Sequence, residues 1–338
     1  MAIQSTLPPL AQPKAKPTAV AEGRRLGKMS SLVLGRFAVL VLGSVIVVAA
    51  TSFPYRTDAV THRGIPQPAD YDAFYKRIYA AAPVAQGASA NATEDPEDEA
   101  YVRIAREAIR SNHVVEGVQA FIKREHLEKS RVLDVGAGTG YLQDLVQNYV
   151  GLDISPTASR YYHKPFIQAS ATDMPIPDND FDLIWSIWVL EHVPNPEQAL
   201  AEIRRVAKDG GLLYLMPAWN CDWYMGDGYR VRAFSDLDWK GKLTKAEMNF
   251  RMYPLFNLMV QAAQRLILGA RPSGPTSLHY VPLKANYDHY WVADSDAINR
   301  LDRYEMSLWF TSRGDECLNC DFHLLATNGP LIIKVHKK

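Results

Sequence analysis

The sequence is poor in cysteine, with only Cys221, Cys317 and Cys320 among its 338 residues. Three cysteines are too few for a disulfide scaffold, and they favour a reducing compartment over an oxidising one. Cys317 and Cys320 have CxxC spacing, but a structural zinc site needs four ligands and the chain has no second CxxC pair. We therefore predict no metal site and interpret the pair as ordinary thiols beside a strand.

The sequence also lacks a net charge, because 37 lysine and arginine residues balance 37 aspartate and glutamate residues. No overall field attracts a polyanion, so a nucleic-acid partner is not predicted. Hydrophobic residues make up 47% of the chain and charged residues 22%, a composition that excludes a disordered protein. The length allows one large domain with appendages, or two modest domains.

The N-terminal part is predicted to lie outside the globular domain. Residues 1–28 form a flexible basic tail, rich in Pro and Ala. Residues 29–53 are apolar except for Arg36 and are about long enough to cross a bilayer. We expect a retained transmembrane or interfacial helix there, with a buried core helix and a cleaved targeting peptide as the alternatives. Residues 54–99 are expected to be a linker, and residues 100–338 the main domain.

Two arguments about the orientation of the apolar segment in the membrane oppose each other. The basic flank on its N-terminal side would send the rest of the chain across the membrane by the positive-inside rule. The cofactor chemistry described below belongs to the cytosol, and an interfacial helix would remove the conflict because nothing would be translocated. We therefore expect a membrane protein whose catalytic domain faces the cytoplasm.

The stretch VLDVGAGTGYL, Val132 to Leu142, places glycines at positions 136, 138 and 140 after a strand predicted for Arg131 to Val135. A helix is predicted from Gly140 onward. Glycines in a strand-to-helix turn permit positive backbone torsions and let a ligand rest directly on amide groups. A plain tight turn would explain one of these glycines but not three. We interpret the turn as a cradle for a nucleotide-type ligand.

Two cofactor classes compete for such a turn. Dinucleotide-binding folds use G-x-G-x-x-G, but here the position of the last glycine is Tyr141. The acid that precedes the glycines, Asp134, suits a cationic or zwitterionic ligand better than a pyrophosphate. In these features the sequence resembles the class I S-adenosylmethionine-dependent methyltransferases. A nicotinamide-dependent oxidoreductase and a catalytically silent binding protein remain the alternatives.

The following segments extend the resemblance to the type 11, ubiquinone-biosynthesis-like methyltransferases, from about Val132 to Met216. Asp153 ends a second predicted strand, at the distance where nucleoside-binding folds place a carboxylate for the ribose hydroxyls. The resemblance further implies that Asp173 and Met174 bind the adenine. The complete set of residues expected to bind S-adenosylmethionine is Asp134, Gly136, Ala137, Gly138, Gly140, Asp153, Ile154, Asp173 and Met174.

The resemblance and the alternation of strands with helices predict an α/β fold, a doubly wound, mostly parallel, seven-stranded sheet of the Rossmann-like methyltransferase type. Residues 219–285 are expected to be an aromatic-rich helical insertion or lid before the last two strands. Residues 285–314 are predicted to contain a helix that ends at Gly314. The acids of Asp294-Ser295-Asp296 resemble the metal-binding acids of glycosyltransferases, but we favour the interpretation that they cap the start of this helix. His323 to Val335 is predicted to be a hairpin that turns at Asn328-Gly329.

Methyl transfer from a sulfonium is an in-line displacement that needs alignment and water exclusion, but no protein nucleophile. If the acceptor is a hydroxyl or an amine, a base helps, and His192, His289 and Asp222 are the candidates. Glu191-His192 could equally be a helix-start pair that fixes its loop. We predict a small-molecule or lipid-linked acceptor, the latter in keeping with a membrane segment.

Overall fold

The computed structural model describes residues 33–44, 46, 71–81, 96–222, 224–251, 274–320 and 328–337. The chain divides into two compact units, Met1–Thr51 and Ser52–Lys338. In the first unit, residues 33–44 are helical and mostly exposed. None of the helices in the described ranges combines the length and the apolar character that a membrane span requires. The tail predicted for residues 1–28 and most of the segment 29–53 lie outside those ranges.

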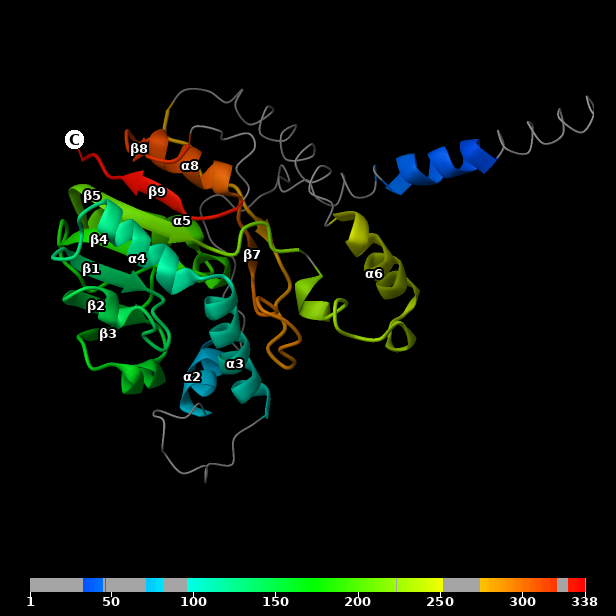
Figure 1. The fold of residues 1–338 in the computed structure, drawn as a ribbon, viewed down its shortest axis with the longest axis horizontal. Coiled ribbons are helices and arrows are strands. Elements are labelled where there is room, and N and C mark those ends of the chain that lie inside the picture. Colours follow the sequence, from blue (N-terminus) through cyan, green and yellow to red (C-terminus); the bar gives the residue numbers. More distant parts are fainter. Residues whose placement is uncertain are drawn as a thin grey trace, which may run out of the picture. The chain divides into compact units, whose positions relative to one another are not determined.

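The second unit is built on a seven-stranded sheet with the order β3-β2-β1-β4-β5-β9-β8 (Figure 1). The first five strands are parallel, whereas β9 is antiparallel to β5 and β8 is antiparallel to β9. This arrangement confirms the predicted doubly wound, mostly parallel sheet. The strands are β1 (Arg131–Val135), β2 (Asn148–Asp153), β3 (Phe166–Gln168), β4 (Phe181–Ile187), β5 (Ala207–Met216), β8 (Glu316–Cys317) and β9 (Leu331–Lys334).

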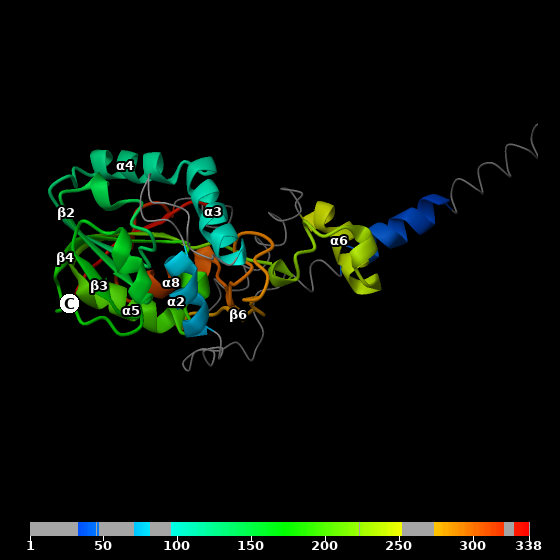
Figure 2. The same cartoon turned by 90° about the horizontal axis from the view of Figure 1, so that it is seen from below.

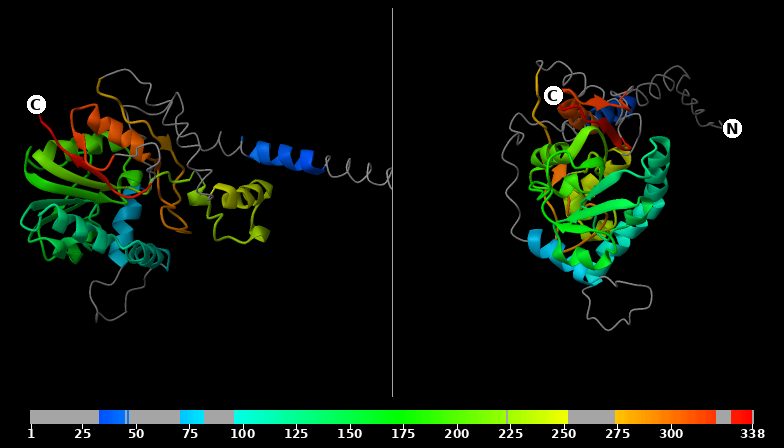
Figure 3. Two further views of the ribbon diagram at one scale, coloured as in Figure 1. Left: turned by 45° about the horizontal axis from the view of Figure 1, so that its top comes forward. Right: turned by 90° about the vertical axis from the view of Figure 1, so that its left-hand side faces the viewer.

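Helices cover both faces of this sheet, as Figures 2 and 3 show. The central strands are apolar runs buried on both sides, as parallel sheets require. One core cluster joins Leu133 of β1 to Leu200 and Ile203 of α5 (Pro196–Val206). The same cluster includes residues of α8 (Arg303–Thr311). The other cluster packs Trp185 of β4 against α4 (Val114–Arg124). The sheet is therefore rigid at the place where its carboxyl ends present loops.

The connection after Gly140 differs from the prediction. Only a short 3-10 helix, η1 (Gln143–Leu145), follows the glycines, because β2 already begins at Asn148 and leaves no room for a longer helix. The connection from β2 to β3 is likewise a 3-10 helix, η2 (Pro156–Tyr161). The glycine turn is thus supported by packing against β2 and η2 rather than by a long helix.

Among the described residues of the second unit, three α-helices precede β1, and α4 is the last of them. α2 (Tyr71–Ala81) and α3 (Pro96–Ser111) lie side by side in Figures 1 and 2, and α2 also contacts η2. The described parts of the predicted linker, 54–99, are therefore helical. The buried side chains of α2, which include Phe74 and Ile78, form a third core cluster with Ile298. This contact joins the start of the domain to a segment more than two hundred residues later.

The segment between β5 and β9 contains η4 (Met225–Asp227), η5 (Phe234–Asp236), α6 (Trp239–Arg251) and a small sheet of β6 (Val281–Pro282) and β7 (Asn299–Arg300). The helix predicted within 285–314 begins only at Arg303, where Asp302 caps it by accepting from the amides of Tyr304 and Glu305. The prediction that Asp294-Ser295-Asp296 starts this helix was wrong. The acids lie in turns before β7 instead.

The C-terminal strands also differ in detail from the prediction. The sixth strand of the sheet in chain order is β8, which lies before residue 321, and it pairs Cys317 with Ile333 of β9. The strand expected within residues 323–327 lies outside the described residues. Cys317 and Cys320 form a disulfide, with their Cα atoms 5.7 Å apart, because the chain turns back directly after β8. The interpretation of this pair as free thiols was therefore wrong.

Candidate active site

Two neighbouring cavities lie at the carboxyl ends of the parallel strands, where open α/β sheets place their ligands. The larger cavity has a volume of about 330 Å³ and the smaller one about 160 Å³. Tyr101, Gly136, Trp188 and His192 line both cavities. Two cavities that share four lining residues form one crevice with two compartments.

The glycine loop after β1 forms one wall of this crevice. Gly136, Gly138 and Gly140 all have positive φ angles, of 74°, 51° and 69°. A Cβ atom at Gly136 would collide with the methyl groups of Val189, and one at Gly140 would lie 3.1 Å from ring carbons of Tyr162. The backbone torsions and close packing within the protein therefore require these two glycines. Gly136, Ala137 and Gly138 line the larger cavity, whereas Gly140 supports the loop from behind.

Asp134 lies in β1, just before the glycine loop, and lines the larger cavity. Its side chain is buried, and Oδ2 accepts a hydrogen bond of 2.8 Å from the hydroxyl of Tyr149. Burial raises the pKa of Asp134 to about 7, and the hydrogen bonds that it accepts offset this only in part. A cation placed in the larger cavity would favour the ionised carboxylate.

Asp153 is the last residue of β2 and lines the smaller cavity together with Ile154. Its Oδ2 accepts from the amide of Gly138 and its Oδ1 from the amide of Ser155, both at 2.9 Å. Burial raises the pKa of Asp153 to about 6, against the lowering effect of these amides. Each oxygen keeps a second lone pair that can accept from a hydroxyl group. Asp153 therefore ties the glycine loop to β2 and also faces the crevice.

The structure places Asp173 and Met174 away from the crevice. Asp173 is exposed, and the Met174 side chain is buried in the core while its amide donates to Glu202 Oε2. Neither residue lines a cavity. The residues that line the smaller cavity here are Ser170, Ala171 and Thr172, which follow β3 directly. The rule that ligands bind at the carboxyl ends of parallel strands could have identified them.

The turn after β4 brings Glu191 and His192 to the shared wall of the two cavities. It begins at Trp188, whose φ of 55° is unusual for a bulky residue, and continues into η3 (Leu190–His192). Strained torsions of this kind concentrate at functional sites. Asn299 of β7 holds the turn in place by donating through Nδ2 to the carbonyl oxygen of Val193, at 2.6 Å.

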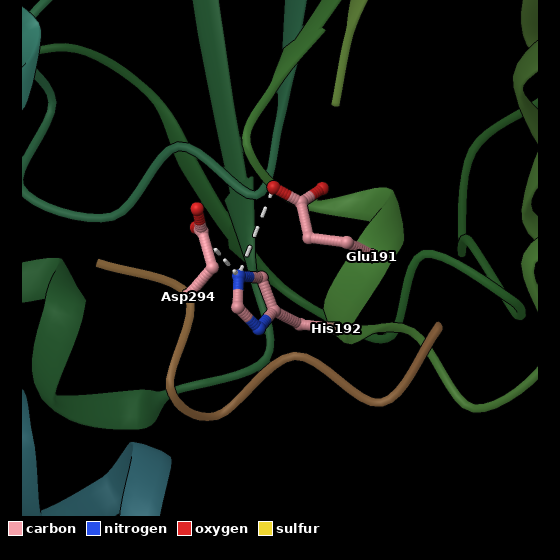
Figure 4. A group of neighbouring side chains, drawn as sticks. All are labelled: Glu191, His192 and Asp294. Atoms are coloured by element: carbon pink, nitrogen blue, oxygen red, sulfur yellow. Dashed lines mark ion pairs between the residues drawn. The ribbon is translucent and has the colours of Figure 1, made fainter. Parts of the chain in front are cut away.

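Glu191 is completely buried, and Oε1 accepts from the amide of Ala218 at 2.9 Å. His192 is 8% exposed, and three carboxylates surround its imidazole. Nε2 lies 3.8 Å from Glu191 Oε1 and 3.9 Å from Asp294 Oδ1, while Nδ1 lies 3.3 Å from Asp296 Oδ2 (Figure 4 shows the first two pairs). Sequence reasoning noticed the two aspartates but did not connect them with His192.

The charges around His192 shift its titration. Burial alone would lower the pKa of His192, but the carboxylates of Asp296, Glu191 and Asp294 together raise it above the usual value. A raised pKa favours the protonated imidazole, and a protonated imidazole cannot accept another proton. The surroundings of His192 therefore disfavour its predicted role as a general base in the ligand-free protein.

The other predicted bases lie elsewhere. His289 is exposed, and its ring packs near that of Trp291, with centroids 5.3 Å apart. Asp222 accepts a hydrogen bond of 2.8 Å from the hydroxyl of Tyr224. Neither residue lines the two cavities. The structure thus does not bring these two candidates together with His192.

The cover of the crevice comes from parts of the chain that were not predicted to supply it. Tyr71 and Tyr75 of α2 line the smaller cavity, and Val102 and Ile109 of α3 line the larger one. Tyr290, Ala293 and Asp294 complete the larger cavity. No described residue of the insertion predicted at 219–285 lines either cavity. For the described part of the chain, α2, α3 and the 290–294 loop therefore take the place of the expected lid.

Comparison with known proteins finds a family match for the segment that builds much of this crevice. Residues 133–215 match the family model described as "Methyltransferase domain", which supports the resemblance stated for Val132 to Met216. This segment covers about a quarter of the chain, and it contains the glycine loop, Asp153 and the Glu191-His192 turn. The match therefore includes most of the crevice floor.

Individual relatives match over longer stretches. A sterol 24-C-methyltransferase of Gibberella zeae is 29% identical over 186 residues, covering 49% of this chain and 46% of the relative. A ubiquinone/menaquinone biosynthesis C-methyltransferase of Pseudomonas savastanoi is 29% identical over 182 residues, covering 44% and 71%. The chain spans about half or less of the length of the curated relatives first matched.

Among solved structures, a SAM-dependent methyltransferase from Aquifex aeolicus matches with 23% sequence identity and a TM-score of 0.27. The match covers 30% of this chain and 65% of that one. The fold described above rests on the strand order and pairing of this chain itself.

Proposed function

We propose that this chain is a methyltransferase that transfers a methyl group from S-adenosylmethionine to a small-molecule acceptor. The observation that carries the proposal is the convergence of a positive-φ glycine loop and two buried carboxylates, Asp134 and Asp153, on one crevice. The match of residues 133–215 to a methyltransferase family supports it, because that segment builds the floor of the same crevice.

The residues present fit the donor in both compartments. Asp134 and the amides of the glycine loop would hold its charged amino-acid end in the larger cavity. Asp153 would accept from the ribose hydroxyls, and Ile154, Ala171 and Thr172 would enclose the adenine in the smaller cavity. A buried carboxylate beside a positive ligand becomes ionised, so donor binding would lower the raised pKa of Asp134.

When bound, the donor supplies a methyl group on a positively charged sulfur, which leaves without help from a protein nucleophile. The chain's own residues then have to align the acceptor with that methyl group and exclude water. Tyr101 and Trp188 line both cavities and are suited to shield the junction between donor and acceptor. No described residue has to form a covalent intermediate.

The larger cavity favours an acceptor with a substantial apolar part. Its wall on the α3 side consists of small and apolar side chains, Val102, Ala105, Ala108 and Ile109. The relatives named above are enzymes of sterol and of quinone biosynthesis, and both products are apolar. We therefore propose an apolar small molecule as the acceptor. A lipid-linked acceptor and membrane attachment through residues 29–53 stay as predictions.

A methyl-transfer assay with labelled S-adenosylmethionine tests the proposal. The full chain is incubated with a panel of quinol, sterol and phenol acceptors, and label in the organic phase is counted. We expect label in at least one acceptor, and much less label when Asp153→Asn replaces the wild type at a limiting donor concentration. Donor binding with no transfer to any acceptor, including whole lipid extracts, would favour the silent binding protein. Binding of NAD in place of the donor would favour the oxidoreductase.

A further inference from the structure

The cluster of Glu191, His192, Asp294 and Asp296 places a single imidazole among three carboxyl groups. Glu191 and Asp296 have no exposed side-chain surface, and the Asp294 side chain is 22% exposed. Within the described part of the chain, no lysine or arginine forms an ion pair with these three carboxylates. One imidazole therefore faces three carboxylates, and buried charges of one sign are stable only with a counter-charge.

The polar atoms of this cluster are also incompletely paired. Glu191 Oε2, Asp296 Oδ1 and His192 Nδ1 are buried and have no hydrogen-bond partner. His192 Nε2 points between Glu191 and Asp294 (Figure 4), at 3.8 and 3.9 Å from their oxygens, which is too long for a hydrogen bond. Buried polar atoms without partners are uncommon in folded proteins and each calls for a reason. Glu191 Oε1, His192 Nε2 and Asp294 Oδ1 face one another at distances longer than a hydrogen bond, which leaves room for a small positive ligand between them.

The spacing of the three central atoms suits a metal ion. One ligand atom each from Glu191, His192 and Asp294 lies within 4.8 Å of the other two. Three atoms about 4 Å apart share a point roughly 2.3 Å from each, within the ~2.0–2.6 Å range of metal–oxygen and metal–nitrogen contacts. An ion could therefore enter with little movement of the side chains.

The residues around the three ligands have the arrangement that supports metal sites. Metal-bound histidines usually donate their other ring nitrogen to a carboxylate, and His192 Nδ1 faces Asp296 Oδ2 at 3.3 Å. Asp296 is itself held by the hydroxyl of Tyr75, at 2.6 Å from Oδ2. Glu191 Oε1 is oriented by the amide of Ala218. Asp294 is held in the left-handed region, with φ of 63°. The ligand atoms are thus positioned before any ion binds.

We propose that Glu191, His192 and Asp294 bind one divalent metal ion at the wall of the larger cavity. Two carboxylates with one imidazole form a mixed oxygen and nitrogen set, which suits Mn²⁺ better than a softer ion that prefers sulfur. Donor binding at Asp134 and Asp153 does not need this ion, so the site goes beyond methyl transfer itself. The sequence predicted no metal site.

If the proposed methyl transfer is correct, the ion would lie where it can bind an oxygen atom of the acceptor. His192 and Asp294 line the larger cavity, so coordination positions not filled by protein would face the acceptor. An acceptor with a hydroxyl or carbonyl oxygen could occupy such a position and be held beside the donor. The ion thus selects acceptors that carry a hard oxygen atom in addition to their apolar part.

Titration of the full chain with Mn²⁺ tests the site directly. The protein is dialysed against a chelator, and free Mn²⁺ is followed by electron paramagnetic resonance as the ion is added. We expect one Mn²⁺ to bind per chain. Asp294→Asn should weaken binding at least about tenfold, because it removes one ligand charge from the set. Asp288→Asn makes the same chemical change at an exposed residue of the same segment and should leave the affinity unchanged.

Two further variants keep the test decisive. Glu191→Gln removes the second carboxylate and should weaken binding to a similar extent, with circular dichroism to confirm that the buried substitution leaves the fold intact. Asp296→Asn keeps all three ligands but alters the partner of Nδ1, so its effect should be smaller. Absence of stoichiometric Mn²⁺ on the wild type, or wild-type affinity in Asp294→Asn, would overturn the site.

The test of the metal site and the test of the proposed function have separate readouts. Binding of S-adenosylmethionine to the chelated wild type, measured in parallel, reports on the donor site alone. Donor binding without Mn²⁺ binding would refute the metal site and leave methyl transfer in place. Mn²⁺ binding without donor binding would support the metal site and refute the proposed function.

Discussion

The glycine loop and the cluster around His192 both place buried carboxylates in the same crevice, but their partners differ. In the loop region, Asp134 accepts from Tyr149, and Asp153 accepts from the amides of Gly138 and Ser155. In the cluster, buried oxygens of Glu191 and Asp296 have no partner. In the first region, hydrogen-bond donors of the protein itself satisfy the carboxylates. In the second region, one imidazole, that of His192, lies beside three carboxyl groups, and we propose a metal ion there.

The two regions also differ in how the chain assembles them. Asp153 and Gly138 are 15 residues apart, so one strand-turn-strand unit builds the loop region. Tyr75 and Asp296, which support the cluster, are 221 residues apart. The cluster therefore depends on the packing of α2 and the 290–299 segment against the turn after β4, whereas the hydrogen bonds of the loop region join β1, β2 and the turns that follow them.

The largest effect is expected on the free energy of unfolding, from a substitution in the glycine loop. Gly136→Ala adds a methyl group that collides with Val189 and forces a side chain onto a φ of 74°. We expect a loss of about 2–4 kcal/mol in the free energy of unfolding, measured by urea denaturation. The double variant with Val189→Ala removes the collision but keeps the torsional strain, so it should recover part of the loss. No recovery would show that the collision contributes nothing.

The next largest effect is expected on donor affinity, where Asp153, which lines the crevice, is compared with Asp173, which does not. Asp153→Asn nearly keeps the shape of the side chain, but it removes the charge that the ribose hydroxyls would bind and replaces one of the two oxygens that accept from the Gly138 and Ser155 amides with an NH2 group. We expect donor affinity to fall by about 10- to 100-fold, the range for a hydrogen bond to a charged group. Asp173→Asn is the matched control, since Asp173 is exposed and lines neither cavity. A larger loss from Asp173→Asn would restore the adenine-binding role predicted from the sequence.

A smaller, gradual change in donor affinity is expected when the pH is lowered. Asp134 has a pKa of about 7 in the ligand-free protein, so below pH 7 most of this carboxyl group is protonated. A cationic ligand prefers the carboxylate, and binding must then release the proton. Donor affinity should therefore fall as the pH is lowered from 8 to 6, by up to about tenfold per unit below the pKa. Titrations of Asp134→Asn over the same range should show weaker binding with a flatter pH profile.

The sequence predicted the loop region well because its determinants are local. The positions of β1, the three glycines and Asp153 all follow from one continuous segment, and the structure brings them to one crevice. Asp173 and Met174, which were predicted to bind the adenine, do not line the two cavities, whereas Ser170–Thr172 line the smaller one shortly after β3 ends at Gln168. The expected helix after Gly140 does not form, since β2 begins too early.

The cluster could not be predicted in the same way. Asp294 and Asp296 were interpreted as a helix start, because the sequence does not show that their segment folds back to the turn after β4. The amide of Ile298 donates to the carbonyl oxygen of Glu191 at 3.0 Å, and this contact between distant segments sets the geometry. Such a contact depends on the complete fold, and the spacing of residue types in the sequence does not predict it.

The central claim is that the crevice at the carboxyl edge of the sheet binds S-adenosylmethionine. Isothermal titration calorimetry of the full chain, with S-adenosylmethionine and NAD as alternative ligands, tests it most directly. We expect one molecule of S-adenosylmethionine to bind per chain, with much weaker binding of NAD. Failure of the wild-type chain to bind S-adenosylmethionine, or tighter binding of NAD, would contradict it.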